Sequence, residues 1–140
     1  MSWLREDELA DVDVLSADDC WAMLEKAPLG RLATRDGEGI DIFPINFTVR
    51  DREIYFRSAP GSKLVDITRA SAVAFEIDGQ HRRTHWSVVV HGTAARLGSD
   101  DEIHASGISL LAAWHPGDKF NYVRVSATSI TGRSFAASRD

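Results

Sequence analysis

Residues 55–64, YFRSAPGSKL, predict a strand that ends in a tight turn and opens directly into a helix. Phe56 alternates with its neighbours in the two-residue pattern of a strand whose two faces differ. Pro60 and Gly61 are typical turn residues, and Ser62 belongs to the residue types preferred at a helix N-cap. The junction therefore anchors the prediction of a β-rich fold with short helices.

The same junction concentrates positive charge. Arg57 stands at the end of the strand and Lys63 in the first turn of the helix. A helix N-terminus presents unpaired backbone N–H groups and the positive end of the helix dipole, so it suits a phosphate group. The alternative is that Ser62 only caps the helix while Arg57 and Lys63 pair with Asp66 or Asp51 on the surface. The spacing matches neither a P-loop nor a dinucleotide fingerprint.

Outward from this junction, turn residues divide the chain into short segments. Ser16 and Asp19 resemble a capping box at the start of a helix that runs to about Lys26. Its apolar stripe comprises Cys20, Trp21 and Leu24. Further helices are predicted at 62–69 and 99–113. The predicted strands are 31–34, 40–49, 53–58, 72–77, 86–97, 121–125 and 130–135.

Three details of this assignment are specific enough to test. The apolar parity of segment 40–49 changes beside Pro44, which predicts a β-bulge there. Segment 72–77 is compact and, apart from Glu76, apolar, as in a central strand. Residues 78–85 form a polar stretch that predicts a loop. Six or seven short strands with three small helices indicate a mainly β domain, an antiparallel barrel or curved sheet.

Composition limits the class of protein. The chain has 140 residues, 44% hydrophobic and 26% charged, as in one soluble globular domain. No apolar run approaches the ~20 residues of a membrane span, and the N-terminus lacks the apolar core of a signal peptide. The single cysteine fits a reducing compartment, so we expect a cytoplasmic protein.

Charge is unevenly distributed. Residues 1–26 hold eight acidic and two basic side chains, although the whole chain has a net charge of only -5. The remainder lacks the basic face that nucleic acid requires, so nucleic acid is not an expected partner. We expect residues 1–15 to form an acidic arm, 16–135 the folded domain and 136–140 a tail.

Three further segments are candidate ligand contacts. A bulge within residues 44–47, PINF, would free backbone groups to bind a planar heterocycle, with Asn46 as a further donor or acceptor; the alternative is an edge-strand irregularity without a ligand. Trp86 and Ser87 follow a basic loop and would flank a cofactor, unless Trp86 is a core residue. Trp114 lies in a Pro- and Gly-containing loop, where it would cover a flat ligand or pack at a dimer interface.

A metal site is not expected. His81 and His85 are four residues apart and His91 follows, but no Cys or pair of carboxylates completes a tetrahedral set. Cys20 on an apolar helical stripe is typical of packing rather than of a nucleophile.

In order and spacing, these segments resemble the flavin-binding split-barrel family related to pyridoxamine 5'-phosphate oxidase. The resemblance rests on GRLA at 30–33, PINF at 44–47, FRSAPGSKL at 56–64, VAFEID at 73–78, WSVVVHG at 86–92 and ITGR at 130–133. It covers roughly residues 15–135, and no single motif decides it.

The resemblance implies an antiparallel split β-barrel of the flavin reductase or pyridoxamine phosphate oxidase type. It further implies a homodimer with FMN at the subunit interface and flavin-dependent oxidoreductase activity on a small molecule. By the same likeness, the FMN phosphate is held by Arg57, Ser58, Ser62 and Lys63. The flavin ring is lined by Ile45, Asn46 and Phe47, with Trp86 and Ser87 nearby and Trp114 approaching from the partner subunit.

One departure argues against vitamin B6 oxidation. Pyridoxamine phosphate oxidases have a C-terminal Arg-x-His substrate motif, and GRSFAASRD at 132–140 lacks it. Two alternatives keep the fold. One is a deazaflavin-dependent reductase, in which Arg82 and Arg83 would serve the longer anionic tail. The other is a non-catalytic flavin- or haem-binding module, in which His81, His85 or His91 would be an axial ligand.

Overall fold

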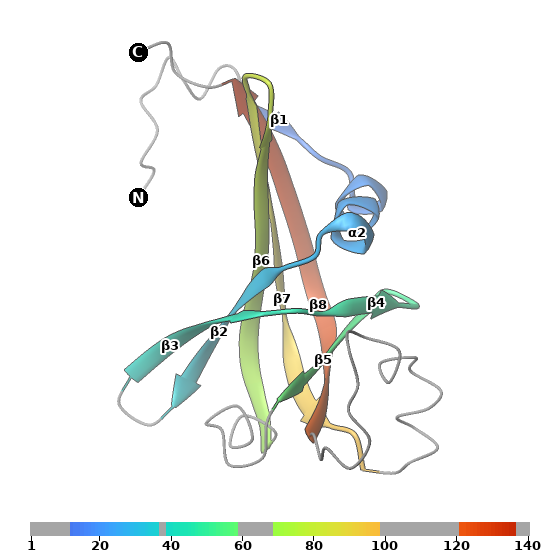
Figure 1. Ribbon diagram of the computed structural model, residues 1–140, viewed down its shortest axis with the longest axis vertical. Coiled ribbons are helices and arrows are strands. Elements are labelled where there is room, and N and C mark those ends of the chain that lie inside the picture. Colours follow the sequence, from blue (N-terminus) through green and yellow to red (C-terminus); the bar gives the residue numbers. More distant parts are fainter. Residues whose placement is uncertain (1–11, 37–38, 59–68, 99–120, 137–140) are drawn as a thin grey trace.

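The computed structural model describes residues 12–36, 39–58, 69–98 and 121–136. In these ranges, eight strands form one antiparallel sheet with a single α-helix against it (Figure 1). The elements are β1 (Val12–Val14), α2 (Ala17–Lys26), β2 (Gly30–Asp36), β3 (Gly39–Ile45), β4 (Thr48–Arg50), β5 (Glu53–Ser58), β6 (Arg69–His81), β7 (Thr84–Arg96) and β8 (Asn121–Ala136).

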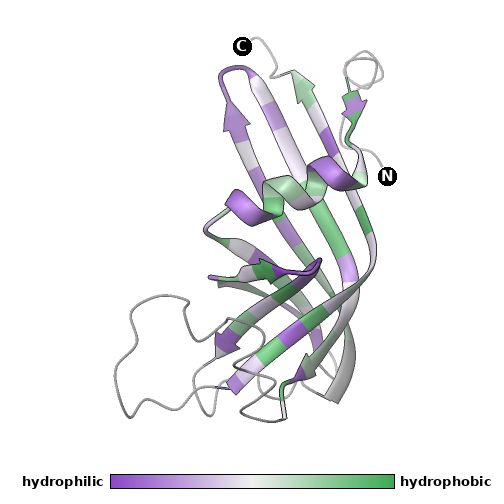
Figure 2. Cartoon of the chain, turned by 90° about the vertical axis from the view of Figure 1, so that its right-hand side faces the viewer, coloured by the Kyte–Doolittle hydropathy of each residue, from purple (hydrophilic) through white to green (hydrophobic). Residues whose placement is uncertain are grey.

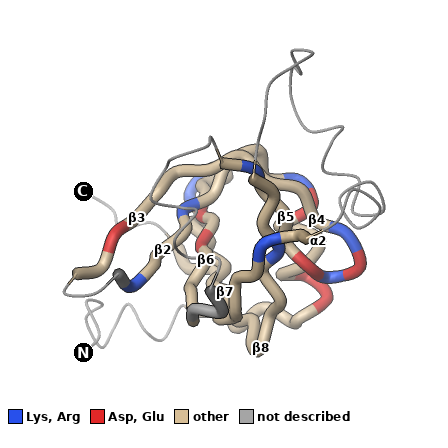
Figure 3. The backbone as a smooth tube through the Cα atoms, turned by 90° about the horizontal axis from the view of Figure 1, so that it is seen from below, with Lys and Arg blue, Asp and Glu red and all other residues tan. Residues whose placement is uncertain are grey.

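The sheet order is β3-β2-β6-β7-β8-β5-β4, with β1 paired to β8. Seen from below, the sheet is strongly curved, with β3 on one side of the view and β4 on the other (Figure 3), and only residues 46–47 separate these two strands in the chain. The prediction of a mainly β, antiparallel barrel is therefore confirmed. The predicted helix at 99–113 and residues 62–68 of the other predicted helix lie outside the described residues.

Helix α2 forms where its sequence predicts. Ser16 is the N-cap, and its Oγ accepts a hydrogen bond of 3.1 Å from the Asp19 backbone N–H. Cys20, Trp21 and Leu24 are buried, as the apolar stripe requires. The helix approaches β8 at Gly132, where a Cβ would lie only 2.5 Å from Cys20 Sγ. A glycine at this position therefore lets the helix pack directly on the strand.

The predicted bulge at Pro44 is wrong. β2 and β3 pair in unbroken register from Gly30↔Ile45 to Asp36↔Gly39, with Pro44 opposite Arg31. The change in parity has another cause: Ile40 and Ile42 lie on the outer face, while Phe43 and Ile45 face the interior. The strand ends at Ile45 and resumes at Thr48 as β4.

The predicted polar loop at 78–85 is also wrong. β6 and β7 pair through it, from Ile77↔Val88 to His81↔Thr84, and only Arg82 and Arg83 form the turn. Arg82 has a left-handed φ of 56°, as tight hairpins require. The polar residues of this segment suggested a loop, but they are compatible with a strand because one face of the hairpin points away from the core.

The last two predicted strands are one continuous strand, β8, whose register against β7 shifts between His91 and Gly92. The central position predicted for 72–77 is confirmed, since β6 lies between β2 and β7. It is not buried on both faces, however: Val73, Phe75 and Ile77 are buried and alternate with more exposed neighbours.

The core fills the barrel between the inner faces of the strands and α2. Hydrophobic and hydrophilic residues alternate along the strands (Figure 2), as expected for a sheet with one buried face. Phe75 is fully buried, and Phe47 meets it edge to face at a centroid distance of 4.8 Å. The other fully buried large side chains are Leu24, Leu32, Ile54, Phe56, Ile77, Val88, Val90, Val123 and Val125.

Candidate functional site

The end of β5 holds an unusual buried hydroxyl. Ser58 continues the inward-facing series of Ile54 and Phe56 and is only 4% exposed. Its Oγ has no hydrogen-bond partner among the described residues. Opposite it on β8, Asn121 is 8% exposed and equally polar. A buried, unsatisfied hydroxyl costs about 1–3 kcal/mol, so this end of the barrel suits a polar ligand.

Arg57 lies on the other face of β5, where its Cα is opposite Tyr122. Burial raises the pKa of Tyr122 above its usual 10.0, and the positive charge of Arg57 offsets part of that rise. Arg57 and Ser58 thus place a cation and a hydroxyl at one strand end, as the phosphate hypothesis requires. Ser62 and Lys63, the other predicted phosphate ligands, lie outside the described residues.

A polar network that the sequence analysis missed continues along the same outer face. The Tyr55 hydroxyl donates to Glu53 Oε2 at 3.4 Å, and Arg124 Nε lies 3.2 Å from the same oxygen. Burial, and secondarily the charge of Glu53, raise the pKa of Tyr55. Arg124 is found only through the pairing of β5 with β8, because the sequence gives no register between them.

The three residues predicted to line the flavin ring at the β3–β4 connection differ in burial: two belong to the core and one is exposed. Ile45 and Phe47 are 7% and 5% exposed and belong to the hydrophobic core. Asn46 between them is exposed. Any contact of Ile45 or Phe47 with a ligand outside the barrel would therefore use backbone groups, whereas Asn46 can offer its side chain.

Trp86 and Ser87 lie near the tip of the β6–β7 hairpin. Trp86 covers Gly79, its Cα partner, and both residues line an open pocket of about 490 Å³ with Ser87. A second pocket of about 280 Å³ lies on the α2 side, where Trp86 faces Met23, Ala27 and Leu29. Trp114, predicted to approach the ligand from a partner subunit, lies outside the described residues.

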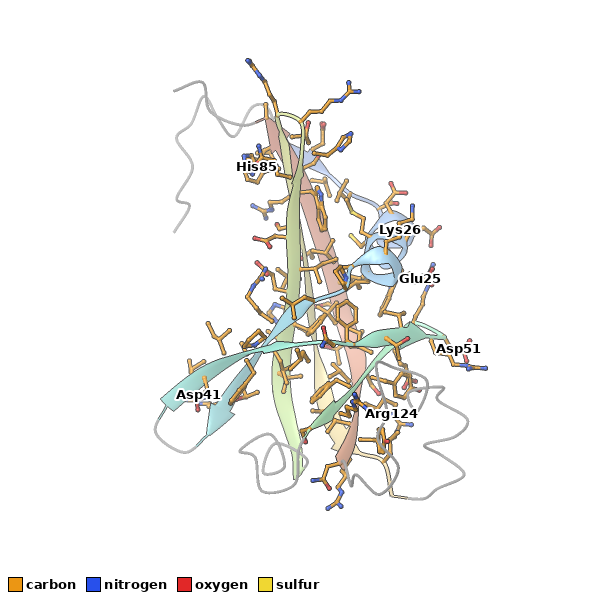
Figure 4. All side chains as sticks on the ribbon, in the orientation of Figure 1. Glu25, Lys26, Asp41, Asp51, His85 and Arg124 are labelled. Carbon is orange, nitrogen blue, oxygen red and sulfur yellow. The ribbon has the colours of Figure 1, made fainter. Side chains whose placement is uncertain are left out.

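Within one chain, the structure does not bring the predicted phosphate contacts at the end of β5 close to Trp86 and Ser87 at the β6–β7 hairpin. Ser58 is opposite Asn121 and Trp86 is opposite Ser134, so their partners on β8 are thirteen positions apart. At ~3.3 Å per strand residue this amounts to roughly 40 Å. Figure 4 shows the same separation, with Arg124 near one end of the sheet and His85 near the other.

The described ranges hold neither a metal-binding cluster nor a helix suited to crossing a membrane. In the described ranges no group of three His, Cys, Asp or Glu residues is placed to hold a metal ion. His85 instead stacks on Phe135 at a ring-centroid distance of 5.5 Å. None of the helices in these ranges has the length and apolar character needed to cross a membrane.

Comparison with known proteins identifies the family. A family model described as pyridoxamine 5'-phosphate oxidase matches residues 16–134. The chain belongs to this family. The match includes the strand end at Arg57 and Ser58, the hairpin with Trp86 and Ser87, and the whole described sheet apart from β1 and the last residues of β8.

Solved structures similar to this chain include two proteins that are named as FAD-binding. An FAD-binding protein from Mycobacterium smegmatis is 37% identical, with a TM-score of 0.81, over 90% of this chain and all of that one. An FAD-binding protein from Mesorhizobium loti is 25% identical, with a TM-score of 0.75, over 88% of this chain and 97% of that one. An uncharacterised protein of Mycobacterium tuberculosis is 37% identical over 62% of this chain and 79% of its own length. These likenesses confirm the split-barrel fold.

Proposed function

We propose that this chain is a flavin-dependent oxidoreductase that binds the riboflavin 5'-phosphate unit common to FMN and FAD. FMN is the minimal ligand with this unit, and the FAD-binding relatives in Mycobacterium smegmatis and Mesorhizobium loti make FAD the natural competitor. The proposed acceptor of reducing equivalents is oxygen or a small organic molecule.

The observation that supports this most directly is the strand end at Arg57 and Ser58. The Ser58 hydroxyl is buried without a partner among the described residues, and Arg57 adds a positive charge at the same strand end, from the other face of β5. A phosphate oxygen accepts hydrogen bonds from hydroxyl and guanidinium donors and would satisfy Ser58. The residues present therefore fit a phosphate ester.

A homodimer would complete the site. Roughly 40 Å of sheet separates Ser58 from Trp86 in one chain, which is longer than FMN. Two copies would let the phosphate contacts of one subunit and the hairpin of the other meet one flavin. An exposed apolar surface is available for such an interface on β3, where Ile40 and Ile42 are 74% and 66% exposed.

The bound flavin would supply hydride transfer at its N5 atom. In this chain Arg57 and Ser58 would bind and orient the phosphate, and Asn46 would offer hydrogen bonds to the edge of the ring. The Trp86 indole would exclude water from one side of the site. None of these residues needs to move a proton, because the cofactor performs the redox step.

Titration with FMN, FAD and a deazaflavin tests the proposal. The purified protein is expected to quench the fluorescence of FMN or FAD with a saturable, one-per-subunit stoichiometry and to migrate as a dimer in light scattering. Clearly tighter binding of the deazaflavin would transfer the proposal to that cofactor, for whose anionic tail Arg82 and Arg83 are exposed in the β6–β7 turn. If none of the three cofactors changes its fluorescence or absorption spectrum, the proposed function is wrong.

A further inference from the structure

A second pocket, distinct from the proposed phosphate site, lies where β2 leaves the edge of β6. It measures about 280 Å³ and is lined by Met23, Lys26, Ala27, Pro28, Leu29, Asp78 and Trp86. β2 pairs with β6 only as far as Arg31↔Glu76, and the chain before Gly30 comes from α2 instead of running along β6 (Figure 1). The pocket is therefore the space between this connection and the edge of β6.

Most of the pocket wall is apolar. Trp86 lies on the inner face of the sheet, because its Cα partner Gly79 follows Ile77 in the inward-facing series of β6. Helix α2 packs on the same face, so the Trp86 indole and the end of the helix enclose the pocket together. Apart from Lys26 and Asp78, all the lining residues are apolar.

Asp78 contributes its backbone to this pocket rather than its carboxylate. Its side chain lies on the outer face with that of Glu76 and accepts from Arg31 at 2.6 Å. Antiparallel strands direct the backbone N–H and C=O groups of successive residues to alternate neighbours, so Asp78 and Glu76 direct theirs to the same edge of β6. At Glu76 this edge is paired with β2, and no described strand continues the pairing at Asp78.

The hairpin turn fixes which edge this is. Only two residues separate His81 from Thr84, and the residues that flank such a loop exchange both backbone hydrogen bonds. Gly79, two residues before His81, therefore bonds to β7, whereas Asp78 turns its N–H and C=O groups to the open edge. Neither group has a hydrogen-bond partner in the ranges that the structure describes.

From this arrangement we infer that the pocket binds a small planar lactam, a ring with N–H and C=O groups on neighbouring atoms. The lactam N–H donates to the Asp78 carbonyl oxygen and its C=O accepts from the Asp78 N–H, as a neighbouring strand would. The ring packs against Trp86, Met23 and Leu29. A purely apolar ligand would instead cover the two backbone groups and leave them without partners. The volume is close to the lower limit of ~300 Å³ for small-molecule pockets, which suits one or two fused rings.

The inference goes beyond the proposed function, because this pocket is formed within one chain and contains none of the phosphate contacts. Binding is therefore measured on flavin-free protein, and flavin titration reports separately on the proposed function. The flavin ring also contains a lactam, so the measurement is repeated with FMN present. Displacement of the lactam by FMN would assign the pocket to the flavin site and overturn the inference of a separate one.

Two probes that differ in one hydrogen-bond donor provide the first test: 2-quinolone and N-methyl-2-quinolone, each titrated by ligand-observed NMR. The first is expected to bind at least about threefold more tightly, because only it can donate to the Asp78 carbonyl oxygen. In spectra of ¹⁵N-labelled protein, 2-quinolone is expected to shift the Asp78 amide signal and to leave that of Asp41 on β3 unchanged (Figure 4). Undetectable binding of 2-quinolone, equal affinity of the two probes, or an unmoved Asp78 amide would overturn the inference.

Two substitutions of Asp78 separate the backbone from the side chain. Asp78→Pro removes the N–H at a position where an edge strand tolerates proline, and it is expected to weaken 2-quinolone binding by about tenfold. Asp78→Ala removes only the carboxylate and is expected to leave the affinity unchanged. Thermal unfolding checks that both variants are folded, and the amide shifts of the wild type decide the matter if Asp78→Pro is not. Equal affinities of the two folded variants would contradict the backbone contact.

Discussion

The indole ring of Trp86 lies directly against the backbone of Gly79, its Cα partner across the β6–β7 hairpin. A Cβ atom on Gly79 would lie 2.5 Å from Cζ2 of this ring. The glycine therefore fixes the position of the indole at the end of the sheet where both pockets lie, since Trp86 and Asp78 line both.

Gly79→Ala is expected to displace Trp86 and to destabilise the protein by about 1–3 kcal/mol, the usual cost of overpacking. Chemical denaturation measures the loss, and tryptophan fluorescence reports the displacement. Gly39→Ala is the matched control, because nothing lies within 4 Å of a Cβ there. Equal stability of the two variants would show that the ring moves without cost.

Ser58→Ala separates binding from folding. The Ser58 hydroxyl has no partner among the described residues, so its removal is expected to leave the free energy of unfolding unchanged or to raise it by up to about 1 kcal/mol. Flavin affinity is expected to fall about tenfold, since a hydrogen bond to a charged group contributes ~1.5–3 kcal/mol. Ser129→Ala, at an exposed position of β8, controls for the loss of a hydroxyl. Unchanged flavin affinity in Ser58→Ala would remove Ser58 from the phosphate site.

Ile40→Glu/Ile42→Glu tests the proposed dimer. Both isoleucines are exposed on the outer face of β3, so the change is expected to leave the monomer folded. If β3 lies at the interface, light scattering should show a shift from dimer to monomer, with the dimer dissociation constant raised at least about tenfold. Flavin affinity should fall in parallel. Val14→Glu on β1, where Val14 is 87% exposed, provides the control. A double variant that remains dimeric places the interface elsewhere.

Cys20 is expected to make stability sensitive to alkaline pH. Burial, with a smaller effect of the Asp19 charge, raises the pKa of its thiol above 9.0. The folded state thus binds the thiol proton more tightly than the unfolded state. The resulting stabilisation is complete below about pH 9 and is lost as the pH rises through the folded pKa. Unfolding of the wild type and of Cys20→Ala between pH 8 and 10 should show a smaller decline in the variant, and the native thiol should resist DTNB. Parallel pH profiles would contradict this.

Particular residues show which parts of the fold the sequence could predict and which it could not. Ser16, Asp19 and the stripe from Cys20 to Leu24 predicted α2 because capping and helical periodicity are local. Ile54, Phe56 and Arg57 predicted the faces of β5 for the same reason. Pro44 and residues 78–85 were misjudged because their environment depends on the partner strand. A proline opposite Arg31 needs no bulge, and polar residues can remain in a strand whose outer face meets solvent.

The sequence by itself determined the β-rich class, the helix α2, the cation and hydroxyl at the end of β5, and the likeness to a flavin-binding family. These features depend on neighbours a few residues apart, where propensity and periodicity act. Only the tertiary structure showed that Ser58 is buried and that Arg124 joins Glu53 and Tyr55. It alone placed Trp86 at the opposite end of β8 from Ser58. The physical reason is that strand register and barrel closure fix such relations between distant segments, and no local pattern encodes them.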